Sequence, residues 1–599
     1  MKKSKRILAL LMSAALLVGV FAGCGSNNGG SKAGSKASSA TKESSQAATP
    51  ESKPADSANT AAGPDDTSEK YSFTVYYNYM GWSKVWGVDA ASKYMSDKFN
   101  VDVNWGGADS DPMAKLNIMV SSDDLPEVIV MDRGPDLNKI ARGGYLQDLS
   151  QYMYDGNSFV DDVPEATRDL LKIDDVLYGI PNWPRKSATG GNYQWIINTN
   201  TYKAVGSPKL ETFEDLHKYA LAVKDAGLTS YSGQSVLPFW CTNTDNAYYC
   251  WWPIYRAMGG AGVLDSYFTQ DGGKLQYALE NETAINALKT ANQWYNEGLF
   301  TAEMFTDSAD QFLEKVTNAR PALLWYDFSL DDTNNFRRIV REQTNTDTSY
   351  EVLGSEAMLP DNMMFPAADG VKVTYGDEAG TVGWNVNCIT KKAENPQRIF
   401  DLFTWMLTKD GSINMMYGPE GGLWEGLDEN GNPNLKKPQS EFTSAELDAA
   451  GAWFWAQPAH ADNVDMTKYA VNEKESPETK NWVVDIQAKV STYNAREPRI
   501  GQKFITDENT GLTDVIDPQT DLGVSRQTIL DQSKAQFPKI VMAASEEEFN
   551  QLVDEMLQFA KSNNVDGIVT EYQKKHDENV KIQGFSGYDP AYDVYQLNK

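Results

Sequence analysis

Residues 115–135 read KLNIMVSSDDLPEVIVMDRGP, and this stretch decides the fold. Residues 115–120 keep the apolar spacing of one helical face, 121–126 cannot continue a helix, and 128–131 form a continuous β-favouring apolar run. A strand that is apolar on both faces is typical of the middle of a mostly parallel sheet covered by helices. The stretch therefore predicts a helix, a tight break and a buried strand in an α/β protein.

Two further β-favouring runs lie upstream, at 71–76 and 101–103, with a helical pattern at 88–99 between them. Parallel strands joined by right-handed helical crossovers bring their carboxyl-end loops to one edge, where ligands of such sheets bind. We therefore expect the polar and aromatic residues at these ends to line one wall of a ligand site. These residues are Trp82, Trp86, Trp105, Asp109, Asp132 and Arg133.

The second half of the chain repeats this pattern. A run at 322–327 predicts another buried strand that ends in aromatic and polar residues, and 384–389 predicts a further strand. The Pro/Gly-rich residues 179–191 predict a passage between two lobes. We expect Trp183 and Arg185 of this passage to line the first wall of the ligand site as well, and Trp384 to lie beside the hinge. The second wall is expected to hold Trp240, Trp251, Trp252, Trp325, Asp327, Glu420 and Trp424.

Composition limits the classes of function. A chain of 599 residues is too long for one compact core, so we expect two or more lobes. Its 54 Lys and Arg against 83 Asp and Glu give a net charge of −29, which argues against nucleic-acid binding. The 16 Trp and 29 Tyr fit either large cores or stacking surfaces for sugars, and composition alone does not choose between them.

The N-terminal residues predict export. A basic head, an apolar run from Ile7 to Phe21 and small residues before Cys24 are typical of a secretory signal at 1–23. The sequence around Cys24 resembles a bacterial lipobox, in which the cysteine is lipidated; an ordinary secretory cut is the alternative. Residues 24–70, rich in Ser, Ala and Gly, predict a disordered tether. We expect a protein anchored by lipid to the extracellular face of the cell membrane.

The chain resembles a known family. The run KLNIMVSSDDLPEVIVMD, then GGYLQDLSQY at 143–152, then LYGIP at 177–181, in that order, resembles family 1 of the extracellular solute-binding proteins of sugar ABC importers. The resemblance implies a two-lobed α/β fold of the periplasmic-binding-protein type II, with a hinge of crossing strands and a C-terminal helical extension. It implies a first lobe of 71–187 plus 375–408 and a second lobe of 188–374 plus 409–599.

Motifs for other chemistry are weak. The sequence has no P-loop, no H-E-x-x-H and no Cys/His cluster at metal spacing, so we expect no metal and no cofactor. Cys241 and Cys250 could form a disulfide or remain as small buried thiols. Residues 428–433 begin like a calcium loop, but Pro433 replaces the required Gly, so a hairpin turn is the favoured interpretation.

Three functions remain open on these residues. The favoured one is the lipoprotein component of an ABC importer that binds a carbohydrate, and the resemblance favours an oligosaccharide. Its partners would be separate permease subunits, and it would have no enzymatic activity. The protein is then expected to act as a monomer. The alternatives are a cell-surface glycoside hydrolase or lyase, since paired carboxylates cannot be excluded from spacing, and a sugar-sensing receptor or adhesin. For each tryptophan named above, core packing is the alternative to ligand binding.

Overall fold

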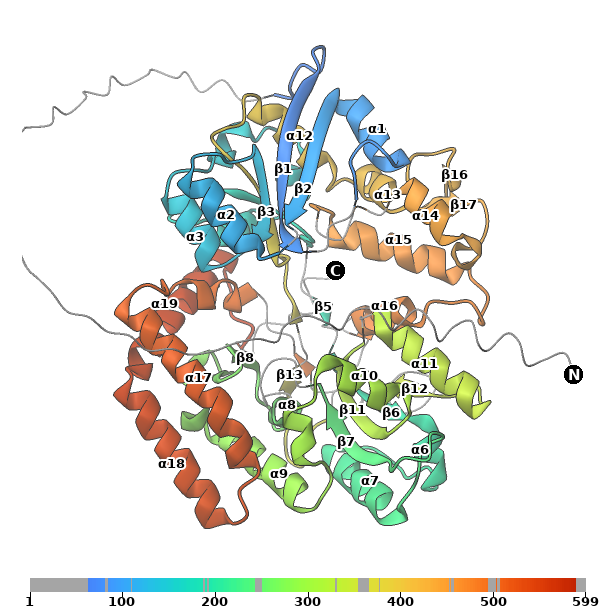
Figure 1. Ribbon diagram of the computed structural model, residues 1–599, viewed down its shortest axis with the longest axis vertical. Coiled ribbons are helices and arrows are strands. Elements are labelled where there is room, and N and C mark those ends of the chain that lie inside the picture. The colour runs from blue at the N-terminus through green and yellow to red at the C-terminus, as the bar shows by residue number, and fades with distance from the viewer. Residues whose placement is uncertain are drawn as a thin grey trace, which may run out of the picture. The chain divides into compact units, whose positions relative to one another are not determined.

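The computed structural model describes residues 63–80, 84–108, 110–186, 189–190, 193–242, 250–328, 331–353, 366–375, 378–451, 453, 457–493, 502–503 and 507–588. These residues form two α/β lobes, each with its own sheet and hydrophobic core (Figure 1). In this part of the chain, no helix combines the length and apolar character needed to cross a membrane.

The sheet of the first lobe has the strand order β2-β1-β3-β15-β4. Strands β1 (Tyr71–Met80), β2 (Val101–Ala108) and β3 (Val128–Asp132) are parallel, while β15 (Asn385–Ile389) runs antiparallel to both β3 and β4 (Gly179–Pro181). Helix α2 (Pro112–Ser121) ends just before Asp123, which takes a φ of +56°. Every residue of β3 except Asp132 is buried. The helix, break and buried strand predicted from 115–135 are therefore present.

Helices cover the first sheet and extend beyond it. They comprise α1 (Ala90–Phe99), α3 (Pro135–Arg142), α4 (Ser158–Asp161), α5 (Glu165–Leu170), α12 (Pro396–Trp405), α13 (Lys409–Tyr417), α14 (Ser444–Ala450) and α15 (Ala461–Glu473), with a 3₁₀ turn, η1, at Leu149–Tyr152. A hairpin of β16 (Trp424–Leu427) and β17 (Pro433–Leu435) follows α13. Tyr417, Trp424 and Val464 are buried in the core of this lobe. Residues 409–473 thus pack with the first sheet, whereas the sequence-based boundaries put them in the second lobe.

The sheet of the second lobe has the order β12-β6-β11-β7. Its strands are β6 (Tyr193–Asn198), β7 (Leu237–Cys241), β11 (Pro321–Asp327) and β12 (Tyr350–Val352), with β7 parallel and β6 antiparallel to β11. The helices are α6 (Thr199–Ala204), α7 (Phe213–Ala226), α8 (Trp252–Ala257), α9 (Glu282–Asn296), α10 (Ala309–Thr317) and α11 (Asp331–Thr344), with 3₁₀ turns η3 (Ala278–Glu280) and η4 (Ala302–Phe305). Thr212 and Asp215 form a capping box that starts α7.

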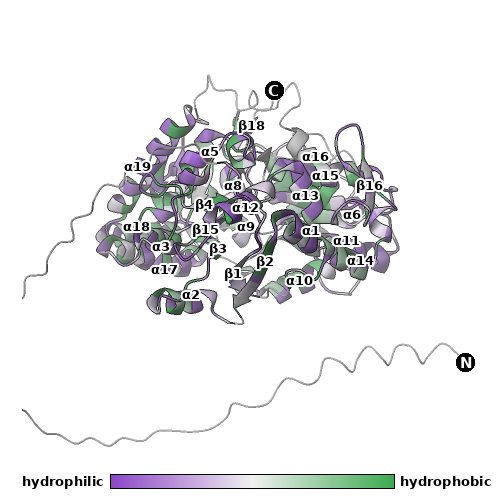
Figure 2. Cartoon of the chain, turned by 90° about the horizontal axis from the view of Figure 1, so that it is seen from above, coloured by the Kyte–Doolittle hydropathy of each residue, from purple (hydrophilic) through white to green (hydrophobic). Residues whose placement is uncertain are grey.

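A C-terminal helical extension packs on the second lobe, as the resemblance implies. Helices α17 (Asp521–Val541), α18 (Glu546–Ser562) and α19 (Val565–Gln583) lie side by side (Figure 1), and Phe537, Met556 and Tyr572 are buried in the core of that lobe. These helices carry both hydrophilic and hydrophobic residues (Figure 2), so each has one face to bury. A small antiparallel sheet of β8 (Gly262–Leu264), β9 (Phe268–Asp271) and β10 (Lys274–Tyr277) contacts α19.

In the part of the chain that the structure describes, three passages connect the two cores. They lie between β4 and β6, between β13 and β15, and between α15 and α16 (Trp482–Tyr493), whose Val483 and Ile486 are buried in the second core. Short strands accompany them: β5 (Thr189–Gly190) pairs with β14 (Glu378–Ala379), and β13 (Thr374–Tyr375) pairs with β18 (Gln502–Lys503). Two short 3₁₀ turns, η7 (Asp507–Asn509) and η8 (Leu512–Asp514), lead into the C-terminal extension. The predicted hinge of crossing strands corresponds to the first two passages.

The folded region begins earlier than the sequence predicts. Arg398 of α12 is 2% exposed, and its guanidinium donates hydrogen bonds to the Asp65 carboxylate and to the carbonyl oxygens of Asp66 and Glu69. Residues 65–69, assigned from composition to the tether, are therefore held against the first lobe. Composition missed this because the anchoring cation lies more than 300 residues away in sequence.

Candidate functional site

The carboxyl edge of the first sheet presents a tyrosine and a carboxylate together. Asp132 is exposed at the end of β3, and the Tyr79 hydroxyl of β1 donates a short hydrogen bond to its Oδ1. Asn385 of β15 lies opposite Asp132 in register. Burial raises the pKa of Tyr79, and the hydrogen bond to Asp132 raises it further, so the phenol stays protonated and remains a donor. The edge thus offers polar groups suited to hydroxyl recognition.

Two predicted tryptophans stack on each other in the crossing segments. The ring centroids of Trp183 and Trp384 are 6.4 Å apart with an interplanar angle of 27°, and Trp384 is 40% exposed. Trp183 has a φ of +49°, a left-handed conformation that is uncommon for a bulky residue and that structures retain where neighbours impose it. Lys468 Nζ of α15 lies 5.3 Å from the Trp183 ring centroid. We call Trp183 and Trp384 the aromatic platform.

Backbone hydrogen bonds hold the two platform segments together. Gly383 N donates to Asn182 O at 3.1 Å, and Arg185 N donates to Thr381 O at 3.0 Å. A Cβ on Gly383 would lie 2.1 Å from Asn182 O, so only glycine permits this approach. The Arg133 guanidinium also binds Gly383, because its Nη2 donates a hydrogen bond to Gly383 O at 2.6 Å. Arg133 therefore supports the platform from the end of β3.

Buried and half-buried carboxylates flank the two arginines of this region. Arg185 Nη2 lies 3.7 Å from Asp465 Oδ2 of α15. Burial raises the pKa of Asp465, while Arg185 and Lys468 act to lower it. Burial likewise lowers the pKa of Arg133, and Asp514 and Asp507 oppose that effect. The cations around the platform are thus already balanced by anions of the same chain.

The carboxyl edge of the second sheet carries an aromatic cluster. Trp325 of β11 lies 5.6 Å from Trp252 at 86° and 6.4 Å from Tyr193, between ring centroids, and Arg256 is 4.5 Å from the Trp252 ring. Tyr193 and Asp327 are opposite each other in the β6–β11 pairing, and both are half-buried. Trp252 and Trp325 are only 5% and 4% exposed, so each also packs as part of the core.

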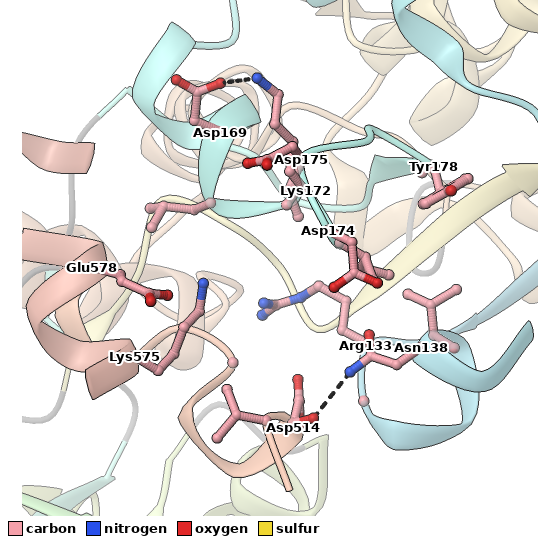
Figure 3. Close-up of a pocket in the computed structure, with 18 of the residues that line it drawn as sticks. Arg133, Asn138, Asp169, Lys172, Asp174, Asp175, Tyr178, Asp514, Lys575 and Glu578 are labelled. Carbon is pink, nitrogen blue, oxygen red and sulfur yellow. Dashed lines mark hydrogen bonds and ion pairs between the residues drawn. The ribbon is translucent and has the colours of Figure 1, made fainter. Parts of the chain in front are cut away.

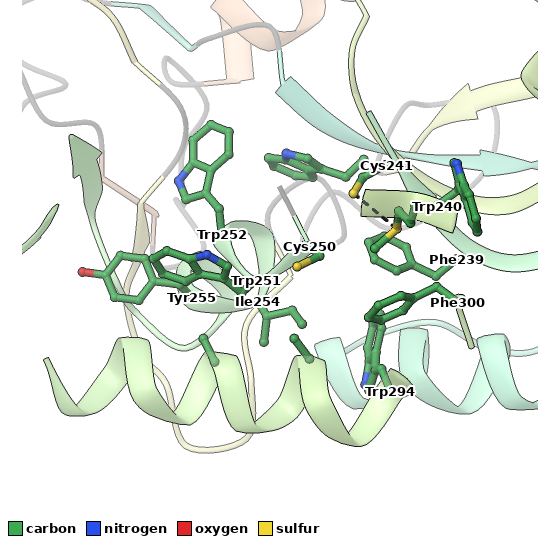
Figure 4. Packing of buried hydrophobic residues seen from close by; sticks show 14 of the residues in the cluster. Phe239, Trp240, Cys241, Cys250, Trp251, Trp252, Ile254, Tyr255, Trp294 and Phe300 are labelled. Carbon is green, nitrogen blue, oxygen red and sulfur yellow. Dashed lines mark hydrogen bonds between the residues drawn. The ribbon is translucent and has the colours of Figure 1, made fainter. Parts of the chain in front are cut away.

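Two predicted wall residues lie in the core of the second lobe. Trp240 and Trp251 are fully buried, as Figure 4 shows among Phe239, Ile254 and Trp294. The Trp240 indole Nε1 donates to Asp307 Oδ2 at 3.1 Å, and Lys315 Nζ pairs with the other oxygen of Asp307 at 2.7 Å. Side chains without exposed surface cannot stack on a ligand in this structure. We correct both to scaffold residues, the alternative that the sequence left open.

The cysteines beside these tryptophans are not bonded to each other. Cys241 and Cys250 are free and buried, and the Cys241 thiol lies 3.5 Å from Met304 Sδ. Burial raises the pKa of both thiols. The second alternative, small buried thiols, is the one the structure shows (Figure 4).

Three other predicted tryptophans pack in the first core. Trp86 and Trp105 stack with centroids 5.7 Å apart, and both meet Trp453 edge-on. Trp424 is 6% exposed, and its Nε1 donates to Gly418 O at 2.9 Å. Trp86 and Trp105 keep 7% and 8% exposure. Their main contacts are therefore structural, and Trp424 lies in the first lobe, not in the second wall where we expected it.

The remaining predicted residues fall into two groups. Glu420 is exposed in the turn that precedes β16 and accepts a hydrogen bond at 2.8 Å from Gly426 N of β16, in the first lobe rather than the second wall. Trp82, Asp109 and Cys24 lie outside the described residues. Residues that sequence reasoning did not select are Tyr193, Asn385 and Lys468. Asn385 lies at the start of the strand predicted at 384–389 and could have been found as a strand end, but nothing local indicates that Lys468 reaches Trp183.

A cavity of about 720 Å³ lies between the first lobe and the C-terminal extension. Figure 3 shows Arg133, Asp174, Asp514, Lys575 and Glu578 around it. Asn138 Nδ2 donates to Asp514 O at 3.0 Å across it, and Arg142 pairs with Asp174 at 2.9 Å on its wall. The described residues that line it include no tryptophan, and the acidic and basic ones among them occur in equal numbers. The cavity has the size of a ligand pocket but no charge preference that would name a ligand.

The calcium-like motif is part of a hairpin, the interpretation that the sequence favoured. Asp428 Oδ1 accepts hydrogen bonds from Asn430 N at 3.0 Å and Asn432 N at 2.8 Å, which shapes the turn between β16 and β17. Across the described ranges, no group of three or more His, Cys, Asp and Glu side chains is placed to hold a metal ion.

Two α/β lobes joined by crossing segments, with polar and aromatic edges, form the architecture of the solute-binding proteins of ABC transporters. The fold predicted from the sequence is thus confirmed. A solved structure of an HMO-binding, ABC-transporter-associated solute-binding protein from Bifidobacterium longum infantis superposes with a TM-score of 0.62 at 14% identity, over 85% of this chain and 99% of that one. The Streptococcus pneumoniae substrate-binding protein FusA in complex with kestose gives 0.55 at 16% identity, over 85% and 99%.

Sequence comparison points to the same kind of protein. The chain is 24% identical over 267 residues to the fructooligosaccharide ABC transporter substrate-binding protein FusA of Streptococcus pneumoniae serotype 4, a match that covers 42% of this chain. The matched region is 47% of that relative, so the chain spans about half the length of the curated relative it matches. No family model matches the sequence. These relatives are binding proteins of ABC transporters and not enzymes, and the resemblance noted in the sequence is confirmed.

Proposed function

We propose that this chain is the substrate-binding protein of an ABC importer and that it captures a carbohydrate between its two lobes. The fold supports this, and so do the relatives that are named as a fructooligosaccharide ABC transporter substrate-binding protein and as an HMO-binding solute-binding protein. The function is then a conformational equilibrium: a ligand that contacts both lobes favours the closed form by its differential affinity, and the importer recognises that form.

The single observation that carries the proposal is the aromatic platform. An exposed tryptophan stacked on a second one, in the segments that join the lobes, offers a flat apolar surface to the C–H face of a pyranose or furanose ring. The Tyr79–Asp132 pair supplies a donor and an acceptor for hydroxyls on the neighbouring sheet edge. The cluster of Tyr193, Trp252 and Trp325 with Asp327 supplies the second wall.

We further propose that the ligand is a neutral oligosaccharide. Arg133, Arg185 and Lys468 are the cations around the platform, and each has a partner: the Gly383 carbonyl, Asp465 and the Trp183 ring, respectively. A carboxylate or sulfate on the ligand would compete with these contacts and would meet Asp132. A neutral chain of several rings would instead use both aromatic clusters.

The proposal includes a location and partners. Lipidation at Cys24 would anchor the protein to the extracellular face of the cell membrane. The folded part would act as a monomer that docks on separately encoded permease subunits. Metabolic labelling with a palmitate analogue, compared between the wild type and Cys24→Ala, tests the anchor.

A thermal-shift screen against neutral and acidic glycans tests the proposed ligand. A ligand at about 100 times its dissociation constant adds about 2.7 kcal/mol to the stability of the folded state, which such a screen detects. Analysis of the same samples for new reducing ends separates binding from the glycoside hydrolase alternative. Co-purification with permease subunits separates an importer component from a receptor or adhesin. The absence of stabilisation by any neutral oligosaccharide would contradict the proposal.

A further inference from the structure

Each of residues 183–186 has a partner on helix α15. The pairs are Trp183 with Lys468, Pro184 with Ala461, Arg185 with Asp465, and Lys186 with Asp462. Two of these contacts hold the backbone, because Ala461 N donates a hydrogen bond to Pro184 O at 2.8 Å and Lys186 N donates one to Asp462 Oδ2 at 3.0 Å. Ala461 begins α15, so the Pro184 carbonyl satisfies one of the N–H groups that the first turn of a helix leaves without an intrahelical partner.

The partners of this segment form one stripe along α15. Residues 461, 465 and 468 are spaced by four and then three, which places them on the same face of a helix, and Asp462 adjoins the first of them. Residues 183–186 have no regular secondary structure of their own. Helix α15 is fixed in the first lobe, since Val464 and Val471 are buried in its core. An irregular segment is thus aligned along a helix that the core holds in place.

Trp183 connects this stripe to the candidate site. Its ring stacks on the 40% exposed Trp384, and the two rings form the aromatic platform. Its φ of +49° is a conformation that a bulky residue retains only where its surroundings impose it. The surroundings include the Lys468 ammonium, 5.3 Å from the ring centroid, and the Ala461 amide that binds the carbonyl of the next residue. A shift of Trp183 would therefore move the surface against which Trp384 stacks.

We propose that α15 positions the aromatic platform and that Lys468 is the positioning residue for the Trp183 ring, an inference that rests on the proposed function. An ammonium group over an indole ring is attracted by the negative charge on the ring face, so Lys468 holds the ring in one place. Lys468 acts through Trp183 and does not contact the sugar. Binding residues on irregular segments need such support to keep a productive geometry. The region 409–473, to which the sequence assigns no part in binding, thereby contributes to the first wall.

The test compares Lys468→Met with Lys468→Arg and Lys98→Met. Methionine removes the cation and keeps a long side chain, whereas arginine keeps the cation. Lys98 is the matched control, because its Nζ lies 5.2 Å from the ring centroid of Trp405, which is not part of the platform. Calorimetric titration with the best-binding neutral oligosaccharide should show an affinity loss of about three- to tenfold for Lys468→Met, and the other two variants should stay within about twofold of the wild type.

Two results of this titration would overturn the inference while leaving the proposed function intact. One is an affinity of Lys468→Met within about twofold of the wild type, and the other is an equal loss in Lys468→Met and Lys468→Arg. If the wild type binds none of the neutral oligosaccharides, the proposed function fails, and the inference fails with it.

A second measurement needs no sugar. Amide hydrogen exchange reports local opening, and Arg185 N and Lys186 N are both hydrogen-bonded, to Thr381 O and to Asp462. In the empty protein, exchange at 182–186 should be at least about threefold faster in Lys468→Met and in Asp462→Ala than in the wild type, and unchanged in Lys98→Met. Asp462→Ala, which should also weaken sugar binding about threefold, covers the case in which Lys468→Met folds poorly. Exchange at the wild-type rate in both α15 variants would overturn the inference.

Discussion

Trp384 and Trp424 show how one residue type serves two purposes in this chain. Trp384 is 40% exposed and stacks on a strained Trp183, whereas Trp424 is 6% exposed and bonds its indole to Gly418 O. The exposure of Trp384, together with the backbone strain at its stacking partner Trp183, marks this pair as the one that is available to a ligand. The sequence could not separate Trp384 from Trp424, because both follow Gly-rich loops near predicted strands. Burial is decided by the packing of distant segments.

Trp384→Ala should weaken oligosaccharide binding by at least about 1 kcal/mol, because it removes the outer stacking surface. The melting temperature of the empty protein should change little, since the side chain is largely exposed. Trp424→Ala should leave the oligosaccharide affinity nearly unchanged but lower the stability of the folded state by about 3–5 kcal/mol, because it leaves a cavity. Calorimetric titration and thermal unfolding of both variants check this. Unchanged affinity in Trp384→Ala would remove the platform from the site.

The crossing segments are the elements on which the site depends. Their contact relies on Gly383, on the Asn182 carbonyl and on the Arg133 guanidinium that donates to Gly383 O. The 3₁₀ turn η7 supports them from the C-terminal side, since Thr381 N donates to Asp507 Oδ1 at 2.7 Å. Glu508 of the same turn is bound by His576 of α19 at 3.1 Å. The extension is thereby linked to the hinge through one short segment.

Gly383→Ala should disturb the platform without touching the ligand. Its Cβ would lie 2.1 Å from Asn182 O, so the two segments must separate, at a cost of about 1–3 kcal/mol. Both the melting temperature and the oligosaccharide affinity should fall. Gly106→Ala on β2 is the control, because its Cβ meets no atom within 4 Å and the backbone is not left-handed there. Equal effects of the two substitutions would show that the close approach is unimportant.

The link between α19 and η7 should make stability depend on pH. Burial alone would lower the pKa of His576, but the Glu508 and Asp577 carboxylates outweigh it and raise the pKa above its usual value. A raised folded-state pKa gives stability that is fully present below about pH 6.5 and is lost as pH rises through the raised value. The melting temperature of the wild type should therefore exceed that of His576→Gln most at pH 5.5 and least at pH 9. A difference that is constant, or that grows with pH, would contradict this assignment.

At the scale of the whole molecule, the residues predict two lobes and a passage between them, and the resemblance implies the hinge of crossing strands and the helical extension. The residues predict the lobes because buried strands and Pro/Gly-rich passages leave local signals at 128–131, 179–191 and 322–327. The sequence-based boundaries fail for residues 409–473, since the apolar residues of α13 and α15 indicate burial but not against which sheet they pack. Tryptophans such as Trp240 and Trp251 were misassigned for the same reason. The lobe to which a segment belongs and the burial of a tryptophan are both decided by long-range packing, which leaves no local signal in the sequence.

The most direct test of the account is calorimetric titration of the purified protein with neutral oligosaccharides alongside uronate and sulfated ones of equal length. We expect saturable binding of a neutral oligosaccharide with one ligand per chain, and much weaker binding of the acidic series because the cations near the platform are already paired. A folded protein that binds no neutral oligosaccharide, or that prefers the acidic series, would contradict the claim that the aromatic platform between the lobes receives an uncharged sugar.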